Sequence, residues 1–254
     1  MERVRSGWTA HYIDGAVIGG APPSWLERSY ETFEAQTLTE GYPCYFGKHI
    51  VRSGDLYVAS VEGDRVEELP RSLATFIDIS ASLRGRRNNL AVFFEPFDIR
   101  LAHERYFEIF WHVLQYLHDH DPFPEAIAHR DAEHPRWEFP FAGEQFFVVG
   151  ASPSYRRRRS RNLGPGMIML FQPRDVFEHT ESGDVVDPGA RQLVRRSLAQ
   201  WDEVGPHPDL GVYGDPGNIE WKQYFLPDGA ERVAGRCPLR MRQPQETSER
   251  VNQS

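Results

Sequence analysis

One histidine falls within the apolar face of the strongest helix in the sequence. Residues 102–121 place apolar side chains at helical spacing, and Trp111, Leu114 and His118 share one side of that helix. The simplest interpretation is a core histidine that is hydrogen-bonded to a backbone carbonyl. A neutral imidazole in a dry aromatic environment is also suited to be the axial ligand of a haem iron, so His118 is a candidate metal ligand, with Trp111 beside it.

Further metal-capable side chains follow that helix. The stretch 118–134 contains His118, His120, Asp121, His129, Asp131 and His134. On a helix the rings of His118 and His120 would point about 200° apart, and no H-E-x-x-H or C-x-x-C pattern is present. A solvated His-rich loop is the simpler interpretation, and a non-haem metal site is the alternative.

Five arginines occupy six positions at 156–161, directly after an apolar run that we interpret as a buried strand. A solvated surface run is the ordinary interpretation of such a sequence. A loop at the rim of a pocket is the functional one, because arginines there bind carboxylates or phosphates with two parallel hydrogen bonds. A module that binds an acidic metabolite through this loop, without any cofactor, is therefore a further alternative.

Two other short stretches could take part in chemistry. Cys44, in YPCYFG, is a nucleophile, a thiolate ligand or, more simply, a small buried side chain at the start of a strand. The stretch 220–224 combines an acid, a base, an amide and two aromatic side chains. A carboxylate beside an aromatic ring suits a guanidinium or ammonium group, but a strand with alternating faces gives the same pattern.

These residues need a scaffold, and the periodicity indicates one. The pattern predicts helices over 22–40 (with Ser24 as N-cap), 67–83, 102–121 and 190–204, and strands over 90–94, 146–150 and 167–171. Two short strands are expected in 44–61, a polar turn at 84–89, and Leu193 and Trp201 on the core side of the last helix. We therefore expect a single α+β domain over residues 1–240, with a mixed central sheet flanked by helices, and a polar, disordered tail over 241–254.

Composition excludes several classes of protein. The formal net charge of −8 argues against a general affinity for nucleic acid or anionic membranes. No apolar run approaches the roughly 20 residues that span a bilayer, and the first residues lack the apolar segment of a secretory signal, so we expect a cytoplasmic protein. Two cysteines make no disulfide scaffold. The phosphate-binding, dinucleotide-binding and nucleophile-elbow glycine motifs are absent from the sequence. A homodimer is expected from base rates alone.

Six motifs in order resemble the YqcI/YcgG family. They are YPCYFG at 42–47, FWHVLQYLHDHD at 110–121, FPFAGEQFFVVGASP at 139–153, the arginine run, MIMLFQPRDVFE at 167–178 and EWKQYFLPDG at 220–229. The resemblance implies an enzyme, since characterised relatives are haem-dependent oxygenases that hydroxylate a guanidino nitrogen in natural-product biosynthesis.

The resemblance also suggests roles for particular residues. It implies one haem b per chain, with His118 as the ligand of the iron, O2 with a reductant or peroxide as oxidant, and a small guanidine or amine as substrate. A redox partner is an accompanying expectation. The other predicted cofactor-binding residues are Trp111, Cys44, Arg156, Arg159, Arg161 and Arg174, and the predicted substrate-binding residues are Glu220, Trp221 and Gln223. The alternatives are a non-haem metalloenzyme that uses the 118–134 stretch and a non-catalytic haem-binding protein.

Overall fold

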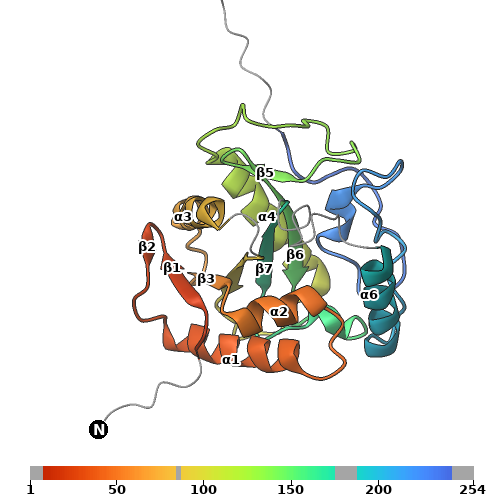
Figure 1. The fold of residues 1–254 in the computed structure, drawn as a ribbon, viewed down its shortest axis with the longest axis horizontal. Coiled ribbons are helices and arrows are strands. Elements are labelled where there is room, and N and C mark those ends of the chain that lie inside the picture. Colours follow the sequence, from red (N-terminus) through yellow and green to blue (C-terminus); the bar gives the residue numbers. More distant parts are fainter. Residues whose placement is uncertain (1–7, 84–86, 175–187, 242–254) are drawn as a thin grey trace, which may run out of the picture.

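The computed structural model describes residues 8–83, 87–174 and 188–241, and its elements form one mixed sheet with helices on both faces (Figure 1). The strands are β1 (His11–Asp14), β2 (Val17–Ile18), β3 (Leu56–Val61), β4 (Asn89–Phe94), β5 (Phe139–Phe141), β6 (Glu144–Ala151) and β7 (Ile168–Pro173). The helices are α1 (Ser24–Leu38), α2 (Tyr45–Ser53), α3 (Leu69–Ser82), α4 (His103–Asp119) and α6 (Pro188–Trp201), with short 3-10 helices η1 (Arg159–Arg161) and η2 (Glu220–Gln223).

The described strands form a seven-stranded sheet in the order β2-β1-β3-β4-β7-β6-β5. Strands β1, β3 and β4 are parallel, whereas β7, β6 and β5 continue the sheet as antiparallel neighbours. Every residue of β4 is buried, and its sequence after Asn89, LAVFF, is apolar without alternation because helices cover both of its faces. The predicted α+β class with a mixed sheet flanked by helices is confirmed.

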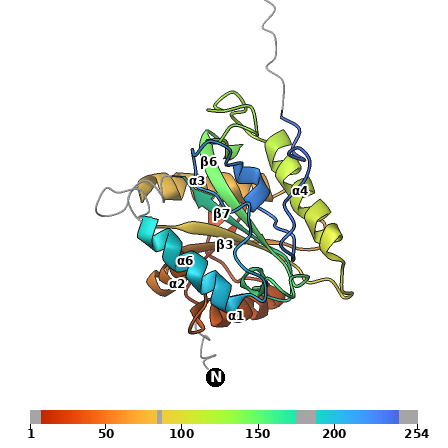
Figure 2. The ribbon, with the colours of Figure 1, turned by 90° about the vertical axis from the view of Figure 1, so that its right-hand side faces the viewer.

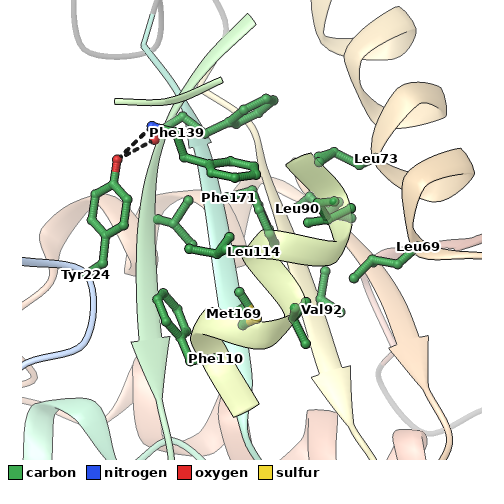
Figure 3. Close-up of a cluster of buried hydrophobic side chains, with 14 of the residues drawn as sticks. Leu69, Leu73, Leu90, Val92, Phe110, Leu114, Phe139, Met169, Phe171 and Tyr224 are labelled. Carbon is green, nitrogen blue, oxygen red and sulfur yellow. Dashed lines mark hydrogen bonds between the residues drawn. The ribbon is translucent and has the colours of Figure 1, made fainter. Parts of the chain in front are cut away.

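Alternate residues of the central strands enter two cores. Leu90 and Val92 of β4 face α3 and α4, in the cluster shown in Figure 3, while Ala91 and Phe93 face α1 and α2. A period of two along a strand produces this division. The two cores matter for the site, because residues in different cores are separated by the sheet.

Several predicted elements are confirmed. The strands at 90–94, 146–150 and 167–171 correspond to β4, β6 and β7, and the helix at 102–121 corresponds to α4. Phe110, Leu114 and Leu117 of α4 are fully buried, as its apolar face predicts. Among the described residues, no helix is both long and apolar enough to span a bilayer.

Other local predictions are wrong. Residues 45–53 form α2 rather than a strand, because the thiol of Cys44 accepts a hydrogen bond from the Gly47 N–H at the start and Gly54, at φ +74°, ends the helix in the left-handed conformation. The first helix lacks a side-chain cap, so Ser24 is its first helical residue and not an N-cap. Leu193 is 58% exposed instead of lying on the core side of α6.

Two short elements at the left edge of the sheet in Figure 1, β1 and β2, have no counterpart among the predicted elements. The stretch 220–224 begins with the 3-10 helix η2 and is not a strand. Residues 84–86 of the predicted polar turn and residues 242–254 of the predicted tail lie outside the described residues.

Candidate functional site

Buried polar side chains gather where η2 meets the ends of β5, β6 and β7. The buried members are Glu138, Asn218, Glu220 and Gln223; the half-buried Arg174 completes the group, which is called the acidic cluster below. Glu138 directly precedes β5 and Arg174 directly follows β7, whereas the other three come from η2 and the residue two positions before it. The cluster therefore joins segments that are far apart in the sequence.

Glu220 is held by two amides. Asn218 Nδ2 donates to Glu220 Oε1 at 2.6 Å, and Gln223 Nε2 donates to Glu220 Oε2 at 3.4 Å and to Asn218 Oδ1 at 3.0 Å. Both carboxylate oxygens thus face donors. Burial nevertheless raises the pKa of Glu220 to about 7, although the hydrogen bond from Asn218 and the charge of Arg174 lower it.

The second carboxylate is paired with an arginine. Arg174 Nη1 donates to Glu138 Oε1 at 2.9 Å, and the Arg174 guanidinium lies 4.1 Å from the ring centroid of Tyr213. Glu138 is 1% exposed. Two buried carboxylates thus lie near one guanidinium, and the charges of both also raise the pKa of Tyr224, for which burial is the largest cause.

Tyr224 fixes η2 against the sheet. Its hydroxyl accepts from the Phe139 N–H and donates to the Phe146 carbonyl, both at 2.9 Å, so one side chain ties η2 to β5 and β6 (Figure 3). Gly150 of β6 allows the next residue, Phe225, to pack closely against the sheet, since a Cβ there would lie 2.5 Å from a ring carbon of Phe225. The sequence therefore positions Glu220 through its neighbours in the same turn.

Aromatic rings border the acidic cluster. The ring of Trp111 is stacked on Tyr224 at 6.3 Å and meets Trp221 edge-on at 6.1 Å. Trp221 Nε1 donates to Glu133 Oε1 at 3.2 Å. Within the described residues, the buried N–H groups of Trp111 and Trp137 have no hydrogen-bond acceptor. Flat rings of this kind are suited to stacking on a planar ligand.

The arginine run meets this cluster through Arg161, which contacts the backbone of Gln223, and the run is largely bound to the protein's own backbone. Arg161 donates to the carbonyls of Gly150, Gln223 and Tyr224, and Arg159 donates to the carbonyl of Trp201. Arg158 is 1% exposed and donates to three further carbonyls. These guanidinium groups therefore stabilise loops, and Arg156 and Arg157 remain exposed.

The residues predicted to bind the cofactor are not brought together. His118 is fully buried in α4, two turns beyond Trp111, on the side of the sheet that carries α3 and α4. Cys44 packs with the other core, against α1 and α2. With Arg159 and Arg161 bound to carbonyls, this set does not surround one space, so as placed it does not fit a haem. His118 as a ligand of iron stays a prediction.

The other predicted metal site is also spread out. His120 stacks on Tyr116, and His129 and His134 stack on each other, with ring centroids 3.9 Å apart. Among the residues that the structure describes, no group of three histidine, cysteine or acidic side chains is placed to hold a metal ion. The non-haem alternative stays a prediction without a preformed ligand set in this part of the chain.

Sequence reasoning found three of the five members of the acidic cluster. Glu220, Gln223 and Arg174 were predicted site residues, and the structure places them together. Glu138 and Asn218 were missed. The signal for Glu138 is its position in the apolar stretch Trp137-Glu138-Phe139, where an acid is expected only if it is paired.

Comparisons with known proteins agree with the family resemblance. The family model described as the YqcI/YcgG family matches residues 33–240. The chain is 35% identical over 229 residues to the uncharacterized protein YcgG of Bacillus subtilis (strain 168), which covers 85% of this chain and 88% of YcgG. It is 34% identical over 206 residues to the uncharacterized protein YqcI of the same organism, covering 78% of this chain and 80% of YqcI.

A third relative has a more specific name. DcsA of Streptomyces lavendulae, provisionally named an N(omega)-hydroxy-L-arginine synthase, is 29% identical over 249 residues, which cover 93% of this chain and 92% of DcsA. No solved structure matches the chain significantly. The family match and the two Bacillus relatives together show that the chain belongs to the YqcI/YcgG family.

Proposed function

We propose that this protein is an oxygenase that N-hydroxylates a guanidino or amino group of a small molecule, in natural-product biosynthesis. The relative DcsA, whose provisional name describes the synthesis of N(omega)-hydroxy-L-arginine, supports the reaction class. The oxygen atom would come from O2 with a reductant or from peroxide. The acidic cluster is the proposed place of the substrate's cationic nitrogen group.

The observation that carries the proposal is the burial of Glu220 together with its raised pKa. Its carboxylate is 3% exposed, and Arg174 is the cation that acts on its pKa, which still lies at about 7. A buried carboxylate in this state is stabilised by a further positive charge, because ion pairing offsets the cost of desolvation. A guanidinium or ammonium group carries that charge together with hydrogen-bond donors.

The chain's own residues would bind and orient the substrate. Glu220 would pair with the cation through the oxygen atoms that Asn218 and Gln223 now hold. The rings of Trp111 and Trp221 would restrict a planar guanidinium and exclude water from it. Because the pKa of Glu220 is about 7, its carboxylate can also take the proton that a cationic nitrogen must lose before it is oxidised.

We propose haem b as the cofactor, on the basis of the family resemblance. A bound haem would supply the activation of O2 or peroxide. Since the predicted haem-binding set is not assembled in this structure, the cofactor needs its own test.

An absorption spectrum of protein made with a haem precursor, reduced under CO, is expected to show a band at about 420 nm for a histidine ligand and about 450 nm for a thiolate. Loss of the band in His118→Ala supports the ligand, and an unchanged band contradicts it. Stoichiometric iron or zinc without a porphyrin band favours the non-haem alternative.

The activity test compares Glu220→Gln with a matched surface variant. Protein is incubated with L-arginine, agmatine or lysine and either peroxide or O2 with a reductant, and a product heavier by one oxygen atom is sought by mass spectrometry. Glu220→Gln is expected to lower kcat/KM about 100-fold, because the counter-charge is lost. Glu108→Gln, on the exposed side of α4, is the control and is expected to change nothing. No product from any guanidine or amine contradicts the proposal.

A further inference from the structure

One face of this acidic protein is basic. The exposed or half-exposed arginines Arg156, Arg157, Arg159, Arg191, Arg195 and Arg196 gather on the arginine loop and on α6, and this set is called the basic face below. The chain as a whole has a formal net charge of −8. Helix α6 contains no acidic residue and also exposes Leu193. Figure 2 looks onto this side of the molecule, with α6 in front.

The two parts of the basic face are joined. The Arg159 guanidinium donates to the carbonyl of Trp201 at the end of α6. In the loop, the Asp228 carboxylate accepts hydrogen bonds from the backbone N–H groups of residues 156–158 at 2.9 to 3.2 Å. The backbone is therefore fixed while the side chains of Arg156 and Arg157 stay exposed. Three acids belong to the same region: Asp228, the buried Asp202, which accepts from Ser160, and Glu203, whose backbone N–H donates to the Arg157 carbonyl at 2.8 Å.

The basic face adjoins the acidic cluster through η1. Arg159, at one end of η1, contacts α6, and Arg161, at its other end, donates to the carbonyls of Gln223 and Tyr224 at 3.1 Å each. Gln223 is itself a member of the acidic cluster. A protein docked on the basic face would thus lie one 3-10 turn away from the proposed substrate site.

With O2 as the oxidant, the proposed reaction needs electrons from a donor. With O2, the balance is R–NH2 + O2 + 2 e⁻ + 2 H⁺ giving R–NHOH + H2O, so one N–O bond forms, the O–O bond breaks and the second oxygen leaves as water. The sequence lacks the glycine fingerprint that binds nicotinamide or flavin dinucleotides. A protein carrier is the class of donor that suits a charged docking surface, and it must deliver two electrons per turnover.

We infer that the basic face docks an acidic one-electron carrier protein that reduces this oxygenase, an inference that rests on the proposed function. Charge complementarity on an otherwise acidic chain selects such a partner, and exposed Leu193 offers an apolar contact among the arginines. Because these arginines are exposed, they act mainly on the rate of encounter, so binding weakens as salt screens them.

The first experiment measures binding directly. The probe is an acidic plant-type [2Fe–2S] ferredoxin, titrated into the protein at low and at physiological salt. The double variant Arg157→Glu/Arg196→Glu is compared with Arg65→Glu/Arg71→Glu, which changes the net charge equally on the far side of the molecule, around α3. Affinity is expected to fall at least tenfold in the first variant and with added salt, and to be unchanged in the control. Equal loss in both variants overturns the inference, as does tighter binding of a single-stranded RNA than of the ferredoxin.

The second experiment separates this inference from the proposed function. Product formation is driven either by peroxide or by the reduced ferredoxin with O2. Arg157→Glu/Arg196→Glu is expected to lower only the ferredoxin-driven rate. Peroxide-driven product together with an unaffected ferredoxin-driven rate overturns the docking surface and leaves the proposed function standing. No product with any oxidant overturns the proposed function, whereas charge-dependent binding of the ferredoxin still supports the surface.

Discussion

Asn218 donates to Glu220 across 2.6 Å, while its own side-chain oxygen accepts from Gln223 across 3.0 Å. This pairing determines which way the Asn218 amide points: its N–H group faces the carboxylate. The amide donates, so it can satisfy Glu220 only when the carboxyl oxygen accepts. Hydrogen bonding therefore favours the ionised form of Glu220, whereas burial favours the neutral form. The ionisation of Glu220 is therefore set by the balance between hydrogen bonding and burial.

The first prediction concerns stability against pH. Burial raises the pKa of Glu220 from 4.5 to about 7 in the folded protein. The stabilisation from the bound proton is therefore complete below about pH 4.5 and is lost as the pH rises through 7, by about 3 kcal/mol in total. Glu220→Gln should remove this loss, so its unfolding free energy should change less than that of the unmodified protein between pH 5 and pH 8. Urea titrations at both pH values measure the difference, and parallel pH profiles would contradict it.

The second prediction concerns binding of a cation. A guanidinium next to Glu220 favours its ionised form, so binding should release a proton when the pH is below about 7. Affinity for agmatine should weaken about tenfold per pH unit below that value. Calorimetry in two buffers of different ionisation enthalpy counts the released protons. Proton-independent binding at pH 6 would show that Glu220 is not the counter-ion.

The third prediction uses a glycine that touches the site only through Asn218. A Cβ at Gly211 would lie 1.9 Å from Asn218 Oδ1, so Gly211→Ala should displace that amide and raise the pKa of Glu220 further. A loss of about 1–3 kcal/mol of stability is expected, because a buried hydrogen bond is broken. Gly205→Ala is the matched control, since a Cβ there has no described atom within 4 Å. Equal stability of the two variants, measured by thermal unfolding, would contradict the packing.

The fourth prediction concerns the arginine loop. Asp228 accepts from three consecutive N–H groups, and its removal leaves all three without their acceptor. Asp228→Ala should cost about 1–3 kcal/mol and speed amide exchange at residues 156–158. Asp98→Ala, on an exposed loop, is the control. Unchanged exchange in Asp228→Ala would assign the rigidity of the loop to the Arg158 side chain instead.

The fold could be predicted where a residue pattern is compatible with only one type of secondary structure. The apolar face of α4 and the continuous apolar runs of β4, β6 and β7 are of this kind. Residues 45–53 place Tyr45, Phe46, Ile50 and Val51 at helical spacing, so the strand predicted there overlooked a helical pattern that a thiol begins and a left-handed glycine ends. Caps of this type are local contacts that composition does not reveal.

The site was predictable only where its residues are neighbours in sequence. Glu220 and Gln223 share one turn, so their spacing was visible. Glu138 and Arg174 meet because β5, β6 and β7 are antiparallel neighbours, and no spacing rule links residues 36 positions apart. The role of Asn218 could be recognised only from the two hydrogen bonds of its side-chain amide. The basic run was visible but misleading in one respect, since three of its five guanidinium groups, those of Arg158, Arg159 and Arg161, donate to backbone carbonyls.

The fixed backbone of the arginine loop also affects how the protein meets proteases. Four consecutive arginines at 156–159 form the densest tryptic target in the sequence. A protease must draw an extended segment of chain into its own cleft, and here that segment is bound to Asp228 while Arg158 is buried. The folded loop should therefore resist trypsin until its hydrogen bonds to Asp228 break, so the rate of cleavage at this one place reports how often the loop opens.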